Sequence, residues 1–530
     1  SLINALPEQI RARVALVEDA LMISEELQGQ MPVVNLVMPL RSCGVSDFQF
    51  VPPSRFDAEF SRYASRSGIG DNEVQQLAID MIARAYECGA TDIHVANMGT
   101  HVRIRFRVLG LLRDDMELDV ETGSRMIRTI YEHLGAAQDA PAFDPISRLD
   151  GRIINRDYLP QGLYSVRIHS EPIECDGAPD GKGTFMPLRL MHDTTGASGS
   201  LEERLAKLGY TDQAATLVNH EGHERTARAQ TELFRALSGR TGIVFISGPT
   251  GSGKSTALAH CMEALIEERP GDNFLSIEDP PEKPIKGMYQ IPVISKEGDE
   301  RGDAYTNAIA GTNRDDTDTV MIGEINAVWA TIHAADALGI IQRLDVQLRS
   351  RLAEPLNIVC DPIVLSGLVF QRLVPKLCPH CKIPLRDHKD SISPDLLTRL
   401  RRTMPDEVIW GGSRGEGIFV RGHGCDHCKG SGHPGLYKQT VVAEVIVADP
   451  WLLTLLRQRK QDDARRYWLS ELQGMTYLEH ARHLIATGVI GPAITEEMLA
   501  MPIDADLARR PRGSERSRQQ HAQDRGKRRA

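Results

Sequence analysis

The sequence GIVFISGPTGSGKST, residues 242–256, decides how this chain is expected to fold. GIVFIS is a short apolar run typical of a buried strand, and the residues after it open a predicted helix. Glycines in the loop between them let backbone N–H groups point inward around phosphate oxygens. Lys254 can reach the β- and γ-phosphates of a nucleotide, and the hydroxyl of Ser255 is placed to bind Mg²⁺. The alternative is a glycine-rich turn that arose by chance. It is disfavoured because every fixed position of the motif is present between a predicted strand and a predicted helix. The stretch predicts a site for ATP and Mg²⁺ formed by Gly248, Pro249, Thr250, Gly251, Ser252, Gly253, Lys254, Ser255 and Thr256.

The composition of the whole chain limits its class. Its 530 residues are enough for several domains, and 41% hydrophobic with 25% charged residues is typical of a globular protein. The net charge of -10 gives no general affinity for nucleic acid. No apolar run approaches the ~18–20 residues needed to cross a bilayer, and we expect no signal peptide. Nine cysteines are too few for a disulfide framework of this length, so we expect a cytoplasmic protein.

The spacing of apolar residues divides the chain into segments. From residue 241 onward, strand, glycine loop, helix and strand alternate, which predicts an α/β core. Upstream, EVQQLAIDMIARAYEC (residues 73–88) has helical spacing, and residues 91–114 alternate as strands do. The arginine-rich C-terminus could bind anionic lipid or an acidic partner, but we favour a solvated, disordered end. The predicted segments are an unassigned N-terminal region (1–70), an α+β domain (71–195), a linker and lead-in helix (196–240), the α/β core (241–377), a tetracysteine insertion (378–440), a mainly helical part (441–504) and a basic tail (505–530).

Two acidic segments follow apolar runs downstream of the glycine loop. FLSIEDPPEKP places Glu278 and Glu282 just after a predicted strand. In-line attack on a γ-phosphate needs a carboxylate that orients or deprotonates water, which is the role expected for Glu282 or Glu278. TVMIGEI ends a strand at Glu324, where an acid can hold Mg²⁺ through water. The alternative for the first segment is a solvated acidic turn, and the alternative for the second is a strand end that does not bind Mg²⁺.

Four of the nine cysteines form two C-x-x-C pairs, CPHC and CDHC. Four thiolates in two such knuckles are the ligand set of a structural Zn²⁺, because they leave no open coordination position for catalysis. The 43 residues between the pairs exceed the spacer of a common zinc ribbon, but a long loop can bulge without disturbing the ligands. Redox-active or unliganded cysteines are the alternative. The predicted zinc ligands are Cys378, Cys381, Cys425 and Cys428.

With these segments in this order, the chain resembles the secretion ATPase superfamily, which contains the motors of type II secretion and type IV pilus assembly. GPTGSGKST resembles its Walker A loop, IEDPPE its Asp box, VMIGEI its Walker B strand and TIHAADA its His box. GATDIHV, VRIRFRVLGLL, DGRI and VRI resemble segments of its N2 domain. The cysteine pairs and GLYKQTVVAEV resemble the assembly and secretion motors rather than the retraction motors. WATIHAADALGIIQRL resembles the ATPases of type IVb pilus systems.

The resemblance implies a RecA-like P-loop core, a PAS-like N2 domain and a homohexamer. It implies that ATP hydrolysis drives domain rotation, which moves pilin or pseudopilin subunits out of the inner membrane. The chain would then be peripheral at that membrane and bind a platform protein of the pilus or secretion system. His333 would sense the state of the γ-phosphate, and arginines from a neighbouring domain would complete each site. The candidates for these arginines are Arg148, Arg152, Arg167 and Arg189.

The segment between Glu324 and His333 departs from the resemblance. The family has a helix beginning RDxET and a loop with TGH there, whereas this chain reads GEINAVWATIH. A parallel crossover needs about a dozen residues or more, and the family places the two strands on opposite sides of the P-loop strand. Residues 325–327 span only about 10 Å when extended. We therefore expect a disrupted sheet, a hairpin or one continuous strand in this region.

Three functions are consistent with these patterns. The first is a hexameric ATPase that drives type IV pilus assembly or type II pseudopilus extension. The second is a member that binds nucleotide without hydrolysing it, because the segment after Glu324 is missing. The third is a nucleic-acid motor, which the acidic net charge and the cysteine knuckles argue against. We expect no specific nucleic-acid partner.

Overall fold

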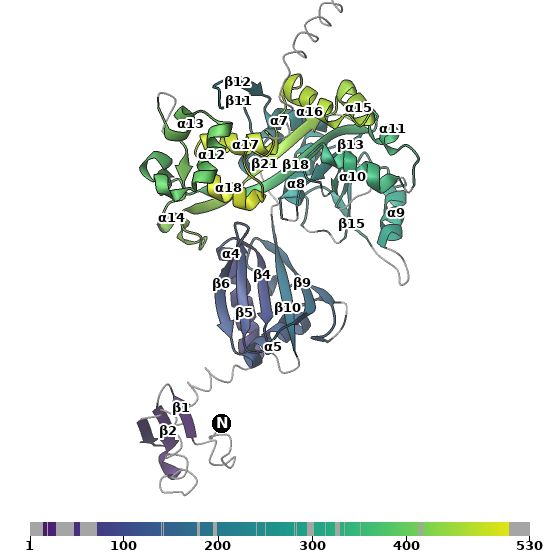
Figure 1. The fold of residues 1–530 in the computed structure, drawn as a ribbon. Coiled ribbons are helices and arrows are strands. Elements are labelled where there is room, and N and C mark those ends of the chain that lie inside the picture. Colours follow the sequence, from purple (N-terminus) through teal and green to yellow (C-terminus); the bar gives the residue numbers. More distant parts are fainter. Residues whose placement is uncertain are drawn as a thin grey trace, which may run out of the picture.

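The computed structural model describes residues 14–17, 20–27, 47–52, 71–138, 140, 142–177, 181–193, 199–239, 241–249, 251–279, 281, 283–293, 301–312, 314–323, 329–332, 334–349, 351–412 and 417–507 (Figure 1). These residues form a small N-terminal sheet, a second sheet with helices on one face, and a larger part in which helices cover a mostly parallel sheet. The predicted mixed α/β character is therefore confirmed. The basic tail after residue 507 lies outside the described residues.

The N-terminal sheet has three strands in the order β1-β2-β3. Its elements are β1 (Val14–Val17), β2 (Ala20–Ser24), the 3₁₀ turn η2 (Glu25–Leu27) and β3 (Asp47–Val51). The first two strands pair antiparallel, whereas β2 and β3 pair parallel. The sequence did not assign this region.

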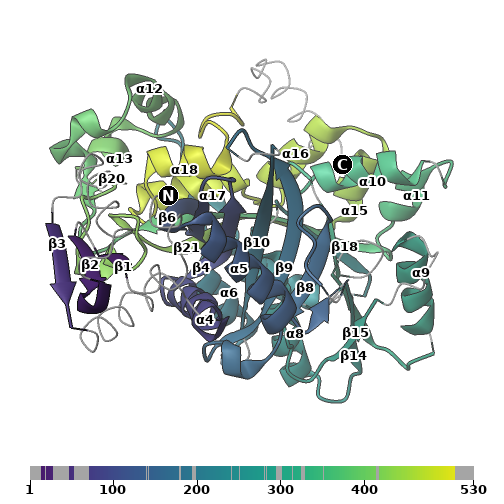
Figure 2. The same cartoon turned by 90° about the horizontal axis from the view of Figure 1, so that it is seen from below.

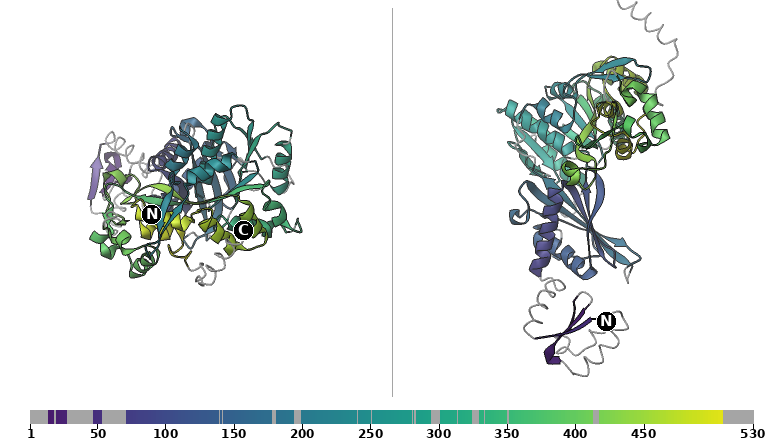
Figure 3. Two further views of the ribbon diagram at one scale, coloured as in Figure 1. Left: turned by 90° about the horizontal axis from the view of Figure 1, so that it is seen from above. Right: turned by 90° about the vertical axis from the view of Figure 1, so that its left-hand side faces the viewer.

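The second sheet has seven antiparallel strands in the order β6-β5-β4-β10-β9-β8-β7. Side chains alternate across it: in β5, Ile104 and Phe106 are buried, and the arginines between them face the other side. Helices α4 and α5 pack on the buried face, which leaves a polar face opposite (Figure 3). The elements are α4 (Asp71–Glu87), β4 (Ala90–Asn97), β5 (Val102–Val108), β6 (Leu111–Leu118), α5 (Val120–Thr129), the π-helix η3 (Ile130–Leu134), β7 (Ala137–Gln138), β8 (Leu149–Ile153), η4 (Arg156–Tyr158), β9 (Leu163–Glu174) and β10 (Lys182–His192).

The segment predicted as linker and lead-in helix packs onto the third part. It comprises α6 (Leu201–Leu208), the hairpin β11 (Ala215–Val218) and β12 (Glu224–Ala227), and α7 (Gln230–Ser238). Helix α6 begins at a full capping box, in which Ser200 and Glu203 satisfy each other's backbone N–H groups. It contacts both α7 and α8, so it is part of the core rather than a free connection.

The core sheet has the order β15-β14-β16-β17-β13-β18-β21, and all its pairs are parallel except β18 with β21. Val244 and Ile246 of β13 pack with α8 on one face, whereas Phe245 packs with α10 and α11 on the other. Figure 2 shows α8 apart from α10 and α11 in the core. The elements are β13 (Ile243–Ser247), α8 (Lys254–Glu268), β14 (Phe274–Glu278), β15 (Tyr289–Pro292), α9 (Arg301–Thr312), β16 (Thr319–Ile322), β17 (Trp329–Ile332), α10 (Gly339–Leu348), α11 (Pro355–Val359), β18 (Leu365–Leu377) and β21 (Leu436–Val447).

The arrangement of β16 and β17 corrects the prediction for the segment between Glu324 and His333. The two strands are neither a hairpin nor one continuous strand: they are separate, parallel neighbours on the same side of β13. Their register explains how a short connection suffices. Trp329 lies opposite Met321, so β17 begins beside the end of β16. The link therefore bridges one strand spacing of about 4.8 Å and does not return along a whole strand.

The residues after β18 form the cysteine unit, residues 378–435, and a cap of four helices. The cysteine unit contains β19 (Ile383–Pro384), η5 (Leu385–Asp387), η6 (Lys389–Ser391), α12 (Pro394–Thr403), α13 (Asp406–Trp410), β20 (Phe419–Val420) and α14 (Asp426–Lys429). The helices are α15 (Pro450–Arg457), α16 (Gln461–Ser470), α17 (Tyr477–Ala486) and α18 (Pro492–Leu499). The boundary predicted at residue 440 falls inside β21, which pairs with β18 in the core sheet.

Candidate functional site

The glycine loop connects the buried strand β13 to α8 at the carboxyl edge of the parallel sheet. Gly251 and Gly253 have φ angles of 75° and 82°, a left-handed conformation that glycine adopts without a steric penalty. Gly253 is the N-cap of α8, so the first backbone N–H groups of this helix border the loop. Such groups, together with the helix dipole, favour an anion at this position.

The polar side chains of the loop lie at the start of α8. Lys254 Nζ donates to the carbonyl oxygens of Gly248 (2.8 Å) and Pro249 (3.0 Å), so its ammonium lies over the loop. Ser255 is exposed, and the hydroxyl of Thr256 accepts a hydrogen bond from Lys283 Nζ at 2.9 Å. Of the predicted nucleotide-binding residues, Thr250 lies outside the described residues.

Glu278 ends β14, which is separated from β13 by β16 and β17 in the core sheet. Its carboxylate is buried and accepts hydrogen bonds from Ser276 Oγ (2.7 Å) and Gln290 Nε2 (2.9 Å). A methyl group on Gly323, which follows β16, would lie 3.3 Å from Glu278 Cγ. The ends of the two acidic segments are therefore in contact at the edge of the sheet.

Glu282, Glu324 and His333 lie outside the described residues. The strands that precede them end at the same edge as β13, because β14, β16, β17 and β13 are parallel. The backbone N–H of Ala334 donates to Ser247 Oγ at the end of β13 (2.9 Å). Of the three strands, β17 therefore ends directly beside β13, whereas β16 and β14 end further along the same edge of the sheet.

Three of the four candidate arginines form a row on the polar face of the second sheet. Arg152 pairs in register with Arg167, and Arg167 with Arg189, on the neighbouring strands β8, β9 and β10. Arg189 Nε donates to Asp92 (2.9 Å) within the same sheet, and Arg148, 80% exposed, pairs with Glu171 at 3.6 Å.

Arg152 makes a contact of a different kind. Its Nη2 donates to the carbonyl oxygen of Pro281 at 2.9 Å, which joins the second sheet to the IEDPPE segment of the core. Its Nε donates to Ser165 Oγ at 3.0 Å, which fixes the guanidinium from behind. Among the candidate arginines, Arg152 is therefore the one with a described contact to the core.

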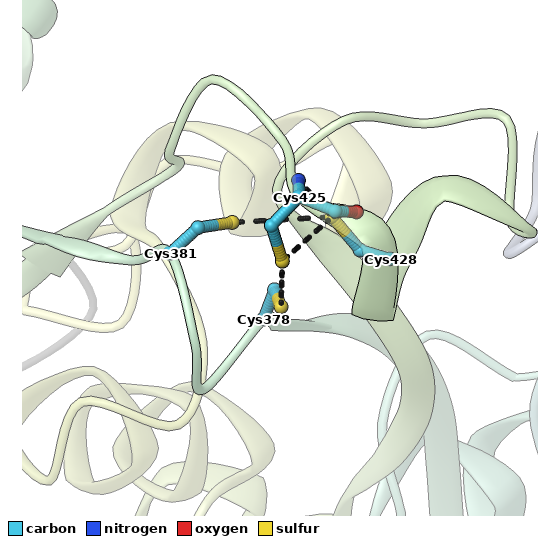
Figure 4. Close-up of side chains that lie close together, drawn as sticks. All are labelled: Cys378, Cys381, Cys425 and Cys428. Atoms are coloured by element: carbon cyan, nitrogen blue, oxygen red, sulfur yellow. Dashed lines mark hydrogen bonds between the residues drawn. The ribbon is translucent and has the colours of Figure 1, made fainter.

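The four predicted zinc ligands come together between the end of β18 and α14 (Figure 4). All four Sγ atoms lie within 4.8 Å of one another, with 3.7 Å between Cys378 and Cys425 and 3.9 Å between Cys381 and Cys428. Four sulfurs bound tetrahedrally at about 2.3 Å from one ion would be about 3.8 Å apart. The thiols therefore fit Zn²⁺ in both number and spacing.

The surroundings of the cluster shift the pKa of Cys381 and that of Cys428 in opposite directions. Burial raises the pKa of Cys381 to about 12. Burial acts in the same direction on Cys428, but hydrogen bonds from the backbone N–H groups of Cys425 and Gly435, together with those from the neighbouring thiols, outweigh it and bring the pKa to about 7. Both N–H groups lie 3.3 Å from Cys428 Sγ. Such donors stabilise a thiolate and orient it toward a metal.

Sequence reasoning missed two buried polar side chains, Gln371 and Glu444. Gln371 on β18 lies behind the glycine loop and bonds to both Ser252 and Tyr210, from which it is 119 and 161 residues distant. Glu444 on β21 accepts hydrogen bonds from the backbone N–H of Ala337 (2.7 Å) and Tyr477 (3.2 Å). Burial, with the nearby charge of Asp336, raises the pKa of Glu444 to about 8. Their only signal in the sequence was a polar residue within an otherwise apolar strand.

None of the helices in the described ranges is both long and apolar enough to span a bilayer.

Comparison with known proteins gives concordant matches. Residues 201–499, more than half of the chain, match the family described as Type II/IV secretion system protein. The chain is 28% identical over 416 residues to the type II secretion system ATPase E of Vibrio cholerae, which covers 74% of this chain and 69% of that protein. It is 27% identical over 398 residues to the type IV pilus assembly ATPase PilB of Thermus thermophilus, which covers 72% of this chain and 38% of that protein. Among solved structures, the Yersinia pseudotuberculosis ATPase DotB aligns with a TM-score of 0.48 at 15% identity over 81% of this chain and 94% of that one.

Proposed function

This chain belongs to the Type II/IV secretion system protein family, and on that premise we propose that it is an ATPase that powers type IV pilus assembly or extension of a type II secretion pseudopilus. The observation that carries the proposal is the glycine loop at the end of β13, with Lys254 over it and the N-terminus of α8 behind it. Relatives named as a type II secretion ATPase and a pilus assembly ATPase support the choice of process.

The loop residues would bind the triphosphate through their backbone N–H groups and Lys254. Mg²⁺, held by Ser255 directly and by Glu324 through water, would neutralise charge on the transferred phosphoryl group. Glu282, or else Glu278, would orient the attacking water. His333 would sense whether the γ-phosphate is present. Because Glu278 is buried and already accepts two hydrogen bonds, Glu282 is the better candidate for the water.

The proposed motor is a homohexamer with a RecA-like core and a PAS-like second domain. In that assembly the arginine row of the second sheet would complete the nucleotide site, and Arg152 already contacts the IEDPPE segment through Pro281. The chain would bind an inner-membrane platform protein from the cytoplasmic side. Zn²⁺ would be held by the four cysteines and would have a structural role.

A second candidate function is a nucleotide-binding member that does not hydrolyse ATP. It is favoured by the connection between β16 and β17, which contains six residues, 323–328, where the resemblance places a helix with acidic residues. The two candidates share nucleotide binding and differ in turnover.

Lys254→Ala tests both candidates. In purified protein, we expect the wild type to bind Mg-ATP and release phosphate, and Lys254→Ala to lose ~10²-fold or more in turnover because the phosphates lose their ammonium partner. Lys286→Ala is the matched control, because it removes the same charge from an exposed position between β14 and β15. Binding without phosphate release would favour the second candidate. Absence of Mg-ATP binding by the wild type would refute both.

A further inference from the structure

A buried amide lies directly behind the glycine loop. Gln371 has no exposed surface, and its Nε2 donates to the carbonyl oxygen of Ser252 at 2.7 Å. The loop also packs closely against the backbone of β18, the strand that carries Gln371. A methyl group on Gly248 would lie 2.2 Å from the carbonyl oxygen of Gln371. The position of the loop is therefore set by β18.

The hydrogen bonds fix which way the amide faces. A backbone carbonyl only accepts, so the NH₂ group of Gln371 must face Ser252. Its Oε1 then faces Tyr210, whose hydroxyl must be the donor. Tyr210 is 2% exposed and packs edge-on against Phe234, with ring centroids 4.9 Å apart. Both side chains are buried, so each group would be left unsatisfied if its partner were removed.

A fixed carbonyl also fixes the next N–H. The peptide between Ser252 and Gly253 is planar, and its C=O and N–H point in opposite directions when the bond is trans. Because Gln371 holds the carbonyl, the Gly253 N–H points away from β18, the direction in which loop amides meet a phosphate. We propose that Tyr210 and Gln371 are positioning residues of the nucleotide site, which set the Gly253 N–H for a phosphate oxygen.

This role rests on the proposed nucleotide-binding function. It means that the segment before the core, which carries Tyr210, also helps to position the glycine loop. Tyr210 follows α6, whose last turn ends at Gly209 in a left-handed conformation with φ of 113°. A methyl group on Gly209 would lie 2.0 Å from Thr440 Oγ1, so this corner is packed tightly against β21. The chain leading from the second sheet into the core therefore reaches the loop through one tyrosine and one glutamine.

Gln371→Met and Tyr210→Phe test the proposal in the full-length protein. Gln371→Met keeps the volume but removes the donor, and we expect dissociation constants for Mg-ADP and Mg-ATP to rise together about 10-fold. AMP, which lacks the β-phosphate, should bind as before. Where turnover is measurable, KM for ATP should rise while kcat stays within about twofold, since the lost contact is equal in the ground and transition states. Tyr210→Phe should have a smaller effect, and the double variant should bind no more weakly than Gln371→Met.

Gln230→Met is the matched control. Gln230 is equally buried and bonds to Ala443 O (2.8 Å) and to the backbone N–H of Thr211 (3.1 Å), but it does not touch the loop. Both glutamine variants should melt at similarly lowered temperatures without nucleotide, and only Gln371→Met should lose affinity for ADP. Unchanged ADP affinity in Gln371→Met, or an equal loss in Gln230→Met, would overturn the positioning role alone. A wild type that binds neither ADP nor ATP would overturn the proposed function as well.

Discussion

His480 on α17 is completely buried against β21. Its Nδ1 accepts a hydrogen bond from the backbone N–H of Ala443 at 3.1 Å, so the ring proton sits on Nε2 and the neutral imidazole is the form that fits. Burial, and to a smaller extent His483, lowers the pKa of His480 to about 3. At this position a charged histidine is therefore excluded throughout the physiological pH range.

The charge state of His480 predicts how stability depends on pH. The unfolded chain takes up a proton near pH 6.5, whereas the folded protein does not do so until about pH 3, so acid favours unfolding between these values. Wild-type stability should fall by up to about 1.4 kcal/mol per pH unit below pH 6.5 from this residue. His480→Gln keeps an acceptor for Ala443 but does not titrate, so its unfolding midpoint should fall less between pH 8 and pH 5. Calorimetric midpoints that drop equally in both proteins would contradict this account.

At the residue scale, local patterns were predictable and distant partners were not. The glycine loop, the lysine and the four cysteines stand in short motifs whose chemistry requires that spacing. Tyr210 and Gln371 are 161 residues apart and meet only after the sheet has formed. The roles of Glu282, Glu324 and His333 remain predictions, because these residues lie outside the described ranges.

At the scale of elements, apolar spacing predicted where helices and strands lie in the sequence, but not which strands pair with each other in the sheets. The helix expected over residues 73–88 is α4, and the alternating stretch after it is β4, β5 and β6. The order of β16 and β17 was predicted wrongly, because their connection was expected to cross β13 and to return along a whole strand. Their register offset, which no local pattern encodes, removes that requirement. The long antiparallel pair β18 and β21 was missed for a similar reason, since the cysteine unit separates its strands.

Loss of zinc should destabilise the cysteine unit. The folding free energy of such a unit includes metal binding, because the ion holds the four cysteine ligands together. We expect Cys381→Ser to lose about one zinc per chain by elemental analysis, and amide exchange across residues 378–435 to become at least ~10-fold faster. Cys88→Ser is the control, because this thiol donates to Ala85 O at 3.2 Å in α4, far from the cluster in sequence. If wild-type protein purified without chelators contains no zinc, the metal assignment fails.

At the scale of the whole molecule, Arg152 makes one of the contacts between the second sheet and the core. Arg152 donates to Pro281 O, and Pro281 directly precedes Glu282. The orientation of the second sheet and the position of the expected water-orienting carboxylate are therefore physically coupled. A rotation between these two parts would break or remake this hydrogen bond.

Arg152→Ala should separate catalysis from binding. We expect the turnover number to fall about 10-fold or more because the carboxylate segment loses its support, while KM for ATP stays within about twofold. Arg148→Ala should change turnover by less than about twofold, because a surface ion pair contributes little. Steady-state phosphate release measures both variants. Equal turnover in Arg152→Ala and wild type would show that the contact has no part in the reaction.

Strand β18 is long enough to act as a lever arm. Its first half pairs with β13 beside the glycine loop, and its second half, residues 371–377, projects roughly 20 Å further. At the far end Leu377 joins the apolar cluster of the second sheet, and the next residue is Cys378. A stiff strand converts angle into distance, so a tilt of about 10° at the loop would displace that end by roughly 3–4 Å. The distance that this end moves for a given tilt would then be set by the length of β18.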